Sequence, residues 1–206
     1  MRFLLLLFAG AVLCAKDAQK VVVEVAIESL CPDCRDVITG SIWEAFRADG
    51  LLDIMDLRLY PYGNAKQQLD QSTGLWKFTC QHGEKECQGN LMQTCAINIV
   101  QNMTVLFPWF WCMERSTSPI DFAPRCASQF GIPWAPIQSC VSSPQGNAWE
   151  HQMGAWTDNL SPAHTEVPWF VVNGAHDETT NQRCAENLIG VVCGLYQGPK
   201  PAGCGR

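Results

Sequence analysis

Residues 21–46 of this 206-residue chain read VVVEVAIESLCPDCRDVITGSIWEAF, and this stretch decides the fold. Residues 21–28 are rich in β-branched side chains and partly alternate apolar with polar positions, which predicts a buried β-strand. Apolar residues then recur through residues 33–48 at a spacing that fits a helix with one buried face. Because Cys31 and Cys34 lie between these two elements, the sequence predicts a strand, a CxxC turn and a helix in direct succession.

The segments that follow extend this pattern at both ends of the chain. Residues 54–60, IMDLRLY, alternate apolar and polar side chains and predict a second strand, which a helical crossover makes parallel to the first. Near the C-terminus, residues 169–172 predict a strand, Asn173-Gly174 predicts a two-residue hairpin turn into a further strand, and residues 179–196 predict a final helix. The order β-α-β, then β-β-α, predicts an α/β fold of the thioredoxin-like type.

The middle of the chain, residues 64–150, differs in composition from the rest, because it is rich in cysteine, tryptophan and proline. Helices are expected there over residues 86–103, 106–114, 120–130 and about 145–157. The prediction is therefore a single thioredoxin-like domain over residues 16–206 with a cysteine-rich helical insertion over about 64–150. The last residues, 198–206, read GPKPAGCGR and are expected to form a flexible tail.

The N-terminus resembles a secretory signal peptide. Arg2 precedes an apolar run over residues 3–13, and small residues follow, so cleavage is expected after Ala15. The run is too short for a membrane span of ~20 residues, and proline or charged residues interrupt every later candidate, so no membrane span is expected. Removing residues 1–15 takes Cys14 away and leaves eleven of the twelve cysteines, so at least one is free or bonds another chain.

The charge of the chain excludes one broad class of partner. The net charge is −6, and only 17% of residues are charged, against about 25% in a typical soluble domain. No basic stretch is present to follow a phosphate backbone, so a nucleic-acid partner is not expected. The oxidising secretory route instead permits disulfides among the remaining cysteines.

The CxxC pair is the main candidate for chemistry. At a helix N-terminus, backbone N–H groups favour a thiolate at Cys31, while Cys34 is one turn further on and is expected to be more buried. We therefore predict that Cys31 is the nucleophile and Cys34 the resolving thiol of a disulfide exchange reaction. Glu28 opposes a thiolate and Arg35 favours it. The alternatives are a permanent disulfide or a zinc clamp, for which the sequence offers no second ligand pair.

Three further positions are singled out by local sequence. Val167-Pro168 precedes the predicted C-terminal strand, where a cis proline would face the CxxC pair and the backbone of Val167 would pair with an extended substrate segment. Asn102-Met103-Thr104 is an N-glycosylation sequon. Asn159 begins a second sequon that Pro162 follows, which should weaken it.

The string CQHGEKECQGNLMQTC, residues 80–95, is the most distinctive in the chain. Taken alone it offers Cys80, His82, Cys87 and Cys95 as metal ligands, but their spacing matches no common zinc module, and disulfides are the expected fate in an oxidising compartment. No metal and no cofactor are therefore expected.

This string resembles the signature of the gamma-interferon-inducible lysosomal thiol reductase family, CQHG-x2-EC-x2-N-x4-C. The fixed positions are all present, namely Cys80, Gln81, His82, Gly83, Glu86, Cys87, Asn90 and Cys95. Other stretches are similar to the family as well, including CME at 112–114, VPWFVVNG at 167–174 and LYQGPKP at 195–201. The resemblance covers nearly the whole chain after the signal peptide.

The resemblance implies a soluble glycoprotein that reduces protein disulfides in acidic late endosomes and lysosomes, and that is also secreted. It implies disulfide-containing protein substrates, a small-thiol or dithiol reductant, sorting by a mannose-6-phosphate receptor and a role in antigen processing. It further implies that Cys204 in the tail links two precursor chains, so that the protein is a monomer or a disulfide-linked dimer. Two alternatives stay open, namely a secretory-pathway oxidase or isomerase and a non-enzymatic disulfide-rich binding protein.

Overall fold

In the computed structural model of this protein, the described residues are 18–205, and the predicted signal peptide lies outside them. The elements before the insertion are β1 (Val21–Ile27), α1 (Pro32–Thr39), α2 (Ser41–Arg47), α3 (Leu51–Ile54) and β2 (Met55–Pro61). The insertion holds β3 (Lys66–Asp70), β4 (Leu75–Thr79), α4 (Glu84–Val100), α5 (Met103–Glu114), α6 (Pro119–Phe130), α7 (Trp134–Val141) and α8 (Pro144–Asp158). The chain then returns through β5 (Trp169–Val172) and α9 (Glu178–Leu195), and ends in a short 3₁₀ helix, Ala202–Gly205.

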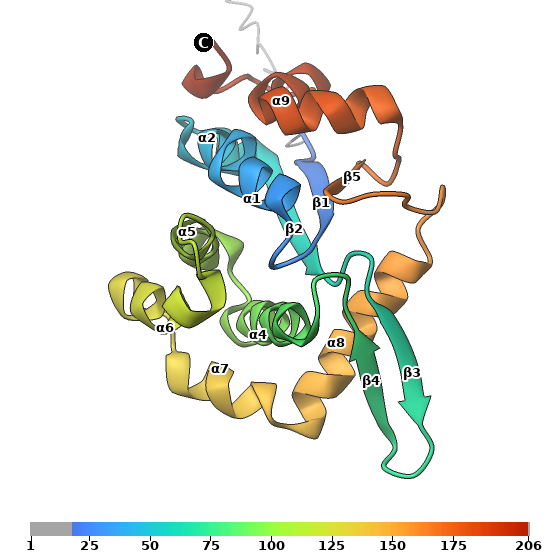
Figure 1. The fold of residues 1–206 in the computed structure, drawn as a ribbon. Coiled ribbons are helices and arrows are strands. Elements are labelled where there is room, and N and C mark those ends of the chain that lie inside the picture. The colour runs from blue at the N-terminus through green and yellow to red at the C-terminus, as the bar shows by residue number, and fades with distance from the viewer. Residues whose placement is uncertain (1–17, 206) are drawn as a thin grey trace, which may run out of the picture.

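The central sheet has the strand order β2-β1-β5 (Figure 1). Strands β1 and β2 are parallel, with Val21 opposite Met55, which confirms the predicted β-α-β unit. Strand β5 runs antiparallel to β1, with Val23 opposite Val172. The strands before and after the insertion, β1 and β5, are therefore neighbours in one sheet, although the whole insertion separates them in sequence.

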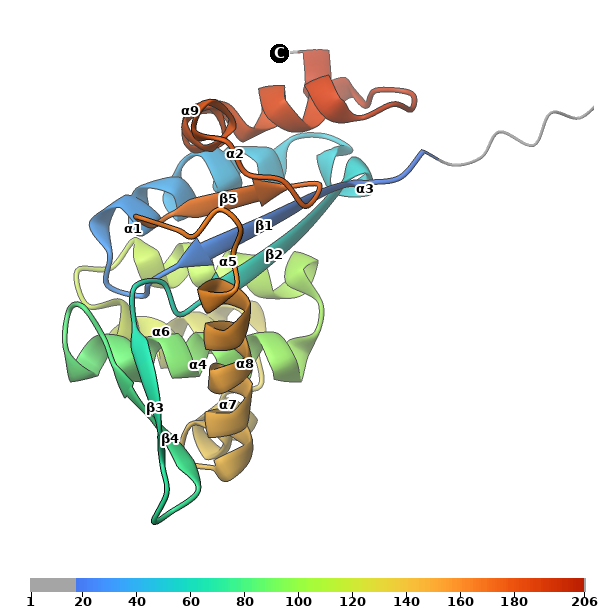
Figure 2. The same cartoon turned by 90° about the vertical axis from the view of Figure 1, so that its right-hand side faces the viewer.

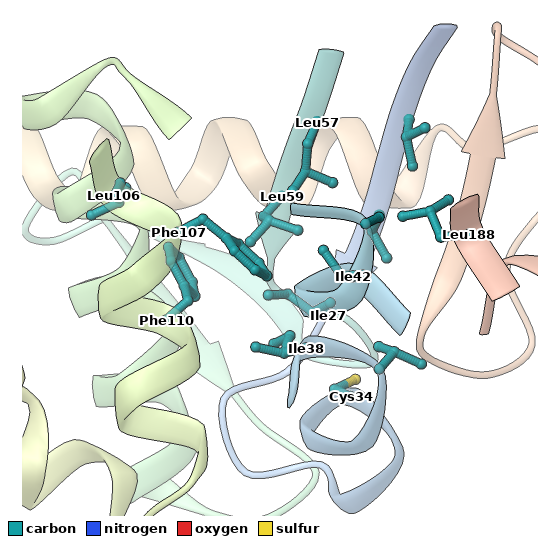
Figure 3. Close-up of a cluster of buried hydrophobic side chains, with 14 of the residues drawn as sticks. Ile27, Cys34, Ile38, Ile42, Leu57, Leu59, Leu106, Phe107, Phe110 and Leu188 are labelled. Atoms are coloured by element: carbon teal, nitrogen blue, oxygen red, sulfur yellow. The ribbon is translucent and has the colours of Figure 1, made fainter. Parts of the chain in front are cut away.

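The helices divide into two groups around this sheet (Figures 1 and 2). Helix α9 packs against β5 and α2, whereas α4 and α8 of the insertion pack against β2. Strand β1 is in the middle and is buried along almost its whole length, as expected for a strand covered on both faces. In Figure 3, Phe107 and Phe110 of α5 lie beside Ile38 and Leu59, so α5 contributes to the same core as the CxxC helix.

The helix predicted over residues 33–48 is in fact two helices, α1 and α2. The break falls at Gly40, whose φ of −105° and ψ of −106° are not helical and whose N–H bonds the carbonyl of Asp36. A Cβ atom at this position would lie 2.7 Å from the Asp36 oxygen, so the bend depends on glycine. The apolar periodicity runs through the bend and gave no sign of it.

The predicted second strand of the C-terminal hairpin is absent from the described structure. The turn itself is present, since Asn173 and Gly174 have φ of 51° and 79°. However, only Ala175 pairs back, through one bridge to Val172. Asp177 then caps α9 by accepting a hydrogen bond from the backbone N–H of Thr180, so the chain enters a helix before a strand can form.

The insertion contains the four predicted helices, as α4, α5, α6 and α8. It also contains α7 and a β-hairpin, β3–β4, which the prediction of an all-helical insertion missed. The hairpin turns at Gly74, whose φ is +71°, and extends beside α8 (Figure 2). Its alternating segment Leu75–Thr79 was visible in the sequence but is only five residues long.

Four disulfides connect eight of the eleven cysteines in the described part of the chain. The pairs are Cys80–Cys87, Cys95–Cys140, Cys112–Cys126 and Cys193–Cys204. The first three lie within the insertion: Cys80–Cys87 links the turn after β4 to α4, Cys95–Cys140 links α4 to α7, and Cys112–Cys126 links α5 to α6. The predicted helical insertion is thus held together by covalent links as well as by its share of the core.

The fourth disulfide corrects the prediction of a loose tail with an intermolecular cysteine. Cys204 bonds Cys193 on α9, and the buried Gly203 donates its N–H to the carbonyl of Asp49 at 2.8 Å. A Cβ atom on Gly203 would lie 2.7 Å from that oxygen, so the 3₁₀ helix is packed closely onto the domain. The odd thiol is instead Cys184, which is buried within α9.

We expect Cys204→Ser to destabilise the monomer rather than to dissolve a dimer. The bond closes a loop with a sequence separation of 11, so its loss should cost about 3 kcal/mol of unfolding free energy. Chemical denaturation would measure this cost, and Cys193→Ser, the matched control, should give the same loss. A wild-type dimer on a non-reducing gel that disappears in Cys204→Ser would contradict this assignment.

Candidate active site

Cys31 and Cys34 occupy the junction of β1 and α1 that the sequence predicted. Cys31 is the N-cap of α1, and its sulfur accepts a hydrogen bond from the backbone N–H of Cys34 at 3.4 Å. Pro32 fills the first helical position, where the missing N–H has no partner to lose. The Cys34 sulfur accepts the backbone N–H of Glu28 at 3.4 Å. Both cysteines are free thiols, so neither is tied to a distant cysteine.

The two thiols differ in acidity in the predicted direction. A hydrogen bond from the Cys34 side chain is the main factor that lowers the pKa of Cys31 to about 7, against the opposing effect of burial. Backbone N–H groups of Cys34 and Asp33 lower it further, while the negative charge of Glu28 raises it. Burial, followed by the hydrogen bond to Cys31, raises the pKa of Cys34 above the ordinary value. Cys31 is therefore the better nucleophile at any pH near neutrality.

The exposure of the two cysteines follows the same order, although both are buried. Cys31 is 7% exposed and Cys34 is fully buried. An attacking thiol is expected to be exposed, and Cys31 is instead almost completely buried. A substrate disulfide must therefore come to the surface at the helix N-terminus, in line with the Cys31 side chain.

Val167 and Pro168 lie against the CxxC pair. The Cys31 sulfur lies 3.8 Å from the carbonyl oxygen of Val167, and the Val167–Pro168 peptide bond is cis. Val167 itself is buried and comes immediately before β5. The structure thus brings together two segments that are more than 130 positions apart and puts the backbone carbonyl of Val167 beside the nucleophile.

The signature string of residues 80–95 packs onto the residues just before Cys31. The amide oxygen of Asn90 accepts the backbone N–H of Ser29 at 2.9 Å, and the hydroxyl of Ser29 donates to the carbonyl of Glu86 at 3.0 Å. A Cβ atom on Gly89 would come within 2.3 Å of the Ser29 hydroxyl oxygen, so this approach requires glycine. The string is therefore part of the wall of the candidate active site.

Within this wall, His82 lies between the carboxylates of Glu86 and Glu28. The three side chains offer one donor atom each within 4.8 Å of one another, a grouping with the chemistry of a cation site. The ring of His82 is already hydrogen-bonded to Glu86, however, which satisfies both groups without an ion. The metal set considered from the sequence is excluded, because Cys80 and Cys87 bond each other and Cys95 bonds Cys140.

A contact between a half-buried arginine and a buried glutamate lies on another side of the CxxC helix. Arg35 of α1 reaches Glu114 of α5, with 3.8 Å between Nε and a carboxylate oxygen, and Gln93 of α4 donates to Glu114 at 3.2 Å. Burial raises the pKa of Glu114 to about 8, and a negative charge at Cys31 acts in the same direction. The sequence gave no reason to place Glu114 here beyond its position in the family-like CME stretch.

The two sequons differ in the state of their amide nitrogens. Asn102 is the exposed N-cap of α5, and its side-chain oxygen accepts the N–H groups of Thr104 and Val105. A sugar on the nitrogen leaves that oxygen free to cap. Asn159 is also exposed, but its side-chain nitrogen donates to the carbonyl of Ala155 at 2.7 Å. The geometry therefore favours Asn102 as an acceptor over Asn159.

The fold and the free CxxC pair at a helix N-terminus define a thioredoxin-like thiol-disulfide oxidoreductase. Two solved structures share the fold. A thioredoxin-like oxidoreductase from Silicibacter pomeroyi has a TM-score of 0.51 at 16% identity, over 81% of this chain and 85% of its own. A putative protein disulfide isomerase from Nitrosomonas europaea has a TM-score of 0.52 at 14% identity, over 77% and 87%.

The chain belongs to the gamma interferon inducible lysosomal thiol reductase (GILT) family, whose sequence model matches residues 22–130. It is 37% identical over 192 residues to the gamma-interferon-inducible lysosomal thiol reductase of Carassius auratus, covering 92% of this chain and 74% of the relative. It is 31% identical to the gamma-interferon-responsive lysosomal thiol protein of Arabidopsis thaliana, covering 95% and 78%. The predicted family is thus confirmed.

Proposed function

We propose that this protein reduces disulfide bonds of protein substrates through Cys31 and Cys34, in an acidic endosomal or lysosomal compartment. The observation that carries the proposal is the asymmetric pair itself, one thiol with its pKa lowered to about 7 at the helix N-terminus and one buried thiol with its pKa raised. A permanent structural disulfide needs no such difference between its two sulfurs.

The reaction proceeds in two exchanges. The Cys31 thiolate attacks one sulfur of a substrate disulfide, and the other substrate sulfur leaves as a thiolate that takes up a proton. Cys34 then loses its proton and attacks the Cys31 sulfur, which releases the second substrate thiol and leaves a Cys31–Cys34 disulfide. A small-thiol or dithiol reductant returns this disulfide to two thiols. No metal or cofactor takes part in these steps.

The backbone of Val167, followed by Pro168, is the proposed docking site for the substrate. It precedes an edge strand of the sheet, and its carbonyl is 3.8 Å from the attacking sulfur. An extended substrate segment that pairs with this backbone brings its own disulfide to Cys31. Since backbone pairing ignores side-chain identity, this mode suits an enzyme that acts on many unfolded proteins.

An acidic compartment is compatible with this chemistry. The pKa of Cys31, about 7, is about two units below that of an unperturbed thiol, 9.0. At pH 5 this difference gives about a hundredfold more thiolate, although only about 1% of Cys31 is ionised. The name of the Carassius auratus relative points to the same compartment.

Family membership supports the remaining parts of the proposal. A signal peptide over residues 1–15 sends the chain into the secretory route, and a glycan at Asn102, with a lesser candidate at Asn159, carries the tag for a mannose-6-phosphate receptor. A fraction of the protein is secreted. In the lysosome the enzyme opens disulfides so that proteins unfold and are degraded, which includes antigen processing where the cell presents antigen. Among residues 18–205, no helix has the length and hydrophobicity needed to cross a membrane.

A reductase assay on a denatured disulfide-bonded protein between pH 4 and pH 8 tests the proposal. With a small dithiol as reductant, we expect reduction at pH 5 well above the enzyme-free rate. Reoxidation or reshuffling of a reduced substrate, without net reduction, would instead favour a secretory-pathway oxidase or isomerase. No catalysis of either kind across this range would favour the non-enzymatic binding protein.

A further inference from the structure

The His82 ring is held in a fixed position beside the candidate active site. The backbone N–H of His82 donates to one carboxylate oxygen of Glu86 at 2.9 Å, and the ring Nδ1 is hydrogen-bonded to the other oxygen. The same Nδ1 lies 3.6 Å from a carboxylate oxygen of Glu28. The Cys80–Cys87 disulfide closes the turn that contains His82, so this arrangement is built into the chain rather than formed on binding.

The Glu28 carboxylate is the group that needs a positive neighbour. Glu28 is 1% exposed, and one of its oxygens accepts the backbone N–H of Asn64 at 2.6 Å. The other oxygen, the one that faces His82, has no hydrogen-bond partner among the described residues. A buried carboxylate without full compensation is costly, and a nearby cation reduces that cost.

Glu28 is also directly linked to the dithiol. Its backbone N–H donates to the Cys34 sulfur at 3.4 Å. A negative charge on its carboxylate raises the pKa of Cys31 and of Cys34, so it opposes both thiolates on which disulfide exchange depends. Whatever offsets the charge of Glu28 therefore favours the reaction.

We propose that His82 is a positioning residue of the dithiol centre, whose imidazolium, fixed by Glu86, offsets the negative charge of Glu28 beside Cys31 and Cys34. This inference rests on the proposed function and assigns a role to the histidine of the signature string. The side chain is 36% exposed at its outer side, so it exchanges protons with water while its inner side faces the buried carboxylates. Hydrogen bonding to Glu86 and the charges of Glu86, Glu28 and Cys31 all raise the pKa of His82, which keeps it cationic in acid.

The other charged groups around the dithiol do not replace His82. Arg35 on α1 is directed toward Glu114 on α5, with 3.8 Å between its Nε and a carboxylate oxygen, and it forms no ion pair with Glu28 among the described residues. Among the groups that act on Cys31, the Cys34 thiol and backbone N–H groups lower its pKa, and Glu28 is the charged group that raises it. His82 is therefore the cation placed to offset Glu28 itself.

The pKa of Cys31 in His82→Asn, measured from the pH dependence of its alkylation by iodoacetamide, tests this role. We expect the pKa to rise by about one unit, which is about a tenfold loss of thiolate at pH 5. His82→Lys, which keeps a positive charge, should restore part of the difference. His151→Asn is the matched control, because His151 stacks on Trp76 in the insertion, and it should leave the Cys31 pKa unchanged.

A double variant separates action through Glu28 from a general structural effect. Glu28→Gln alone should lower the pKa of Cys31, and in that background His82→Asn should raise it by less than half as much as in the wild type. An unchanged Cys31 pKa in His82→Asn, or an equal effect in both backgrounds, overturns the inference. Alkylation needs no disulfide substrate, so this result is independent of whether the protein proves to be a reductase.

Discussion

Replacing Cys31 with serine is expected to reduce disulfide reduction to the uncatalysed background, a loss on the order of a thousandfold or more. The reason is that a serine hydroxyl stays protonated and does not attack a disulfide, whereas the Cys31 thiol has its pKa lowered to about 7. The reductase assay at pH 5 measures the loss. Cys184→Ser is the matched control, because Cys184 is the third free cysteine of the described chain and is buried in α9.

Replacing Cys34 with serine should stop the reaction one step later. The Cys31 thiolate still attacks, but the second exchange cannot follow, so mixed disulfides between Cys31 and substrate should accumulate on non-reducing gels. Cys184→Ser should keep full activity and trap nothing, since burial raises the pKa of that thiol to about 12. Activity that survives in Cys31→Ser would contradict the whole proposed mechanism.

The second large effect concerns stability, which we expect to be several kcal/mol greater at pH 5 than at pH 8. Glu114 and Glu150 are almost completely buried, and burial raises the pKa of each carboxyl to about 8. The hydroxyl of Thr94 donates a hydrogen bond to Glu150 at 2.6 Å, and the side-chain amide of Gln93 donates one to Glu114. These interactions offset only part of the cost of burying a charge.

The direction in which stability changes with pH follows from the number of protons that the folded and the unfolded protein bind. Between about pH 4.5 and pH 8, the folded protein keeps the protons on Glu114 and Glu150, whereas the unfolded chain releases them. Stability therefore falls as pH rises through this window, by up to about 1.4 kcal/mol per pH unit for each group, and levels off above pH 8. The fold is thus better suited to an acidic compartment than to a neutral one.

Chemical denaturation at pH 5 and pH 8 measures this dependence. Glu150→Gln imitates the protonated side chain, so it should change stability little at pH 5 and increase it at pH 8. Glu114→Gln should behave similarly but with a smaller gain, because it also removes the charge partner of Arg35. Glu84→Gln, at an exposed position of α4, is the matched control and should keep the wild-type slope. A wild-type protein whose stability is constant or rises between pH 5 and pH 8 would exclude this effect.

Much of the outer fold could be predicted because its signals are local. The β-branched run of β1, the alternation of β2 and the helix that follows Cys31 depend on neighbours in the chain, and the structure confirms them. Gly40 escaped prediction because a glycine inside an apolar helical pattern also occurs in unbroken helices. The strand predicted after Gly174 is missing because Asp177 is the N-cap of α9 and starts a helix there. An aspartate is common both in turns and at helix N-caps, so the sequence did not distinguish the two.

By itself, the sequence determined which residues carry the chemistry. Two cysteines at the end of a strand and the start of a helix form the dithiol, and the signature string identifies the family, whereas the burial that raises the pKa of Cys34 belongs to the tertiary structure. The tertiary structure alone decided what surrounds them. His82 contacts Glu28, which is 54 positions away in sequence, and Glu114 contacts Arg35, which is 79 positions away. Cys204 forms its disulfide with Cys193 of the same chain. Hydrogen bonds and charge interactions act over a few ångströms of space, and sequence separation does not reveal which distant residues folding brings within that range.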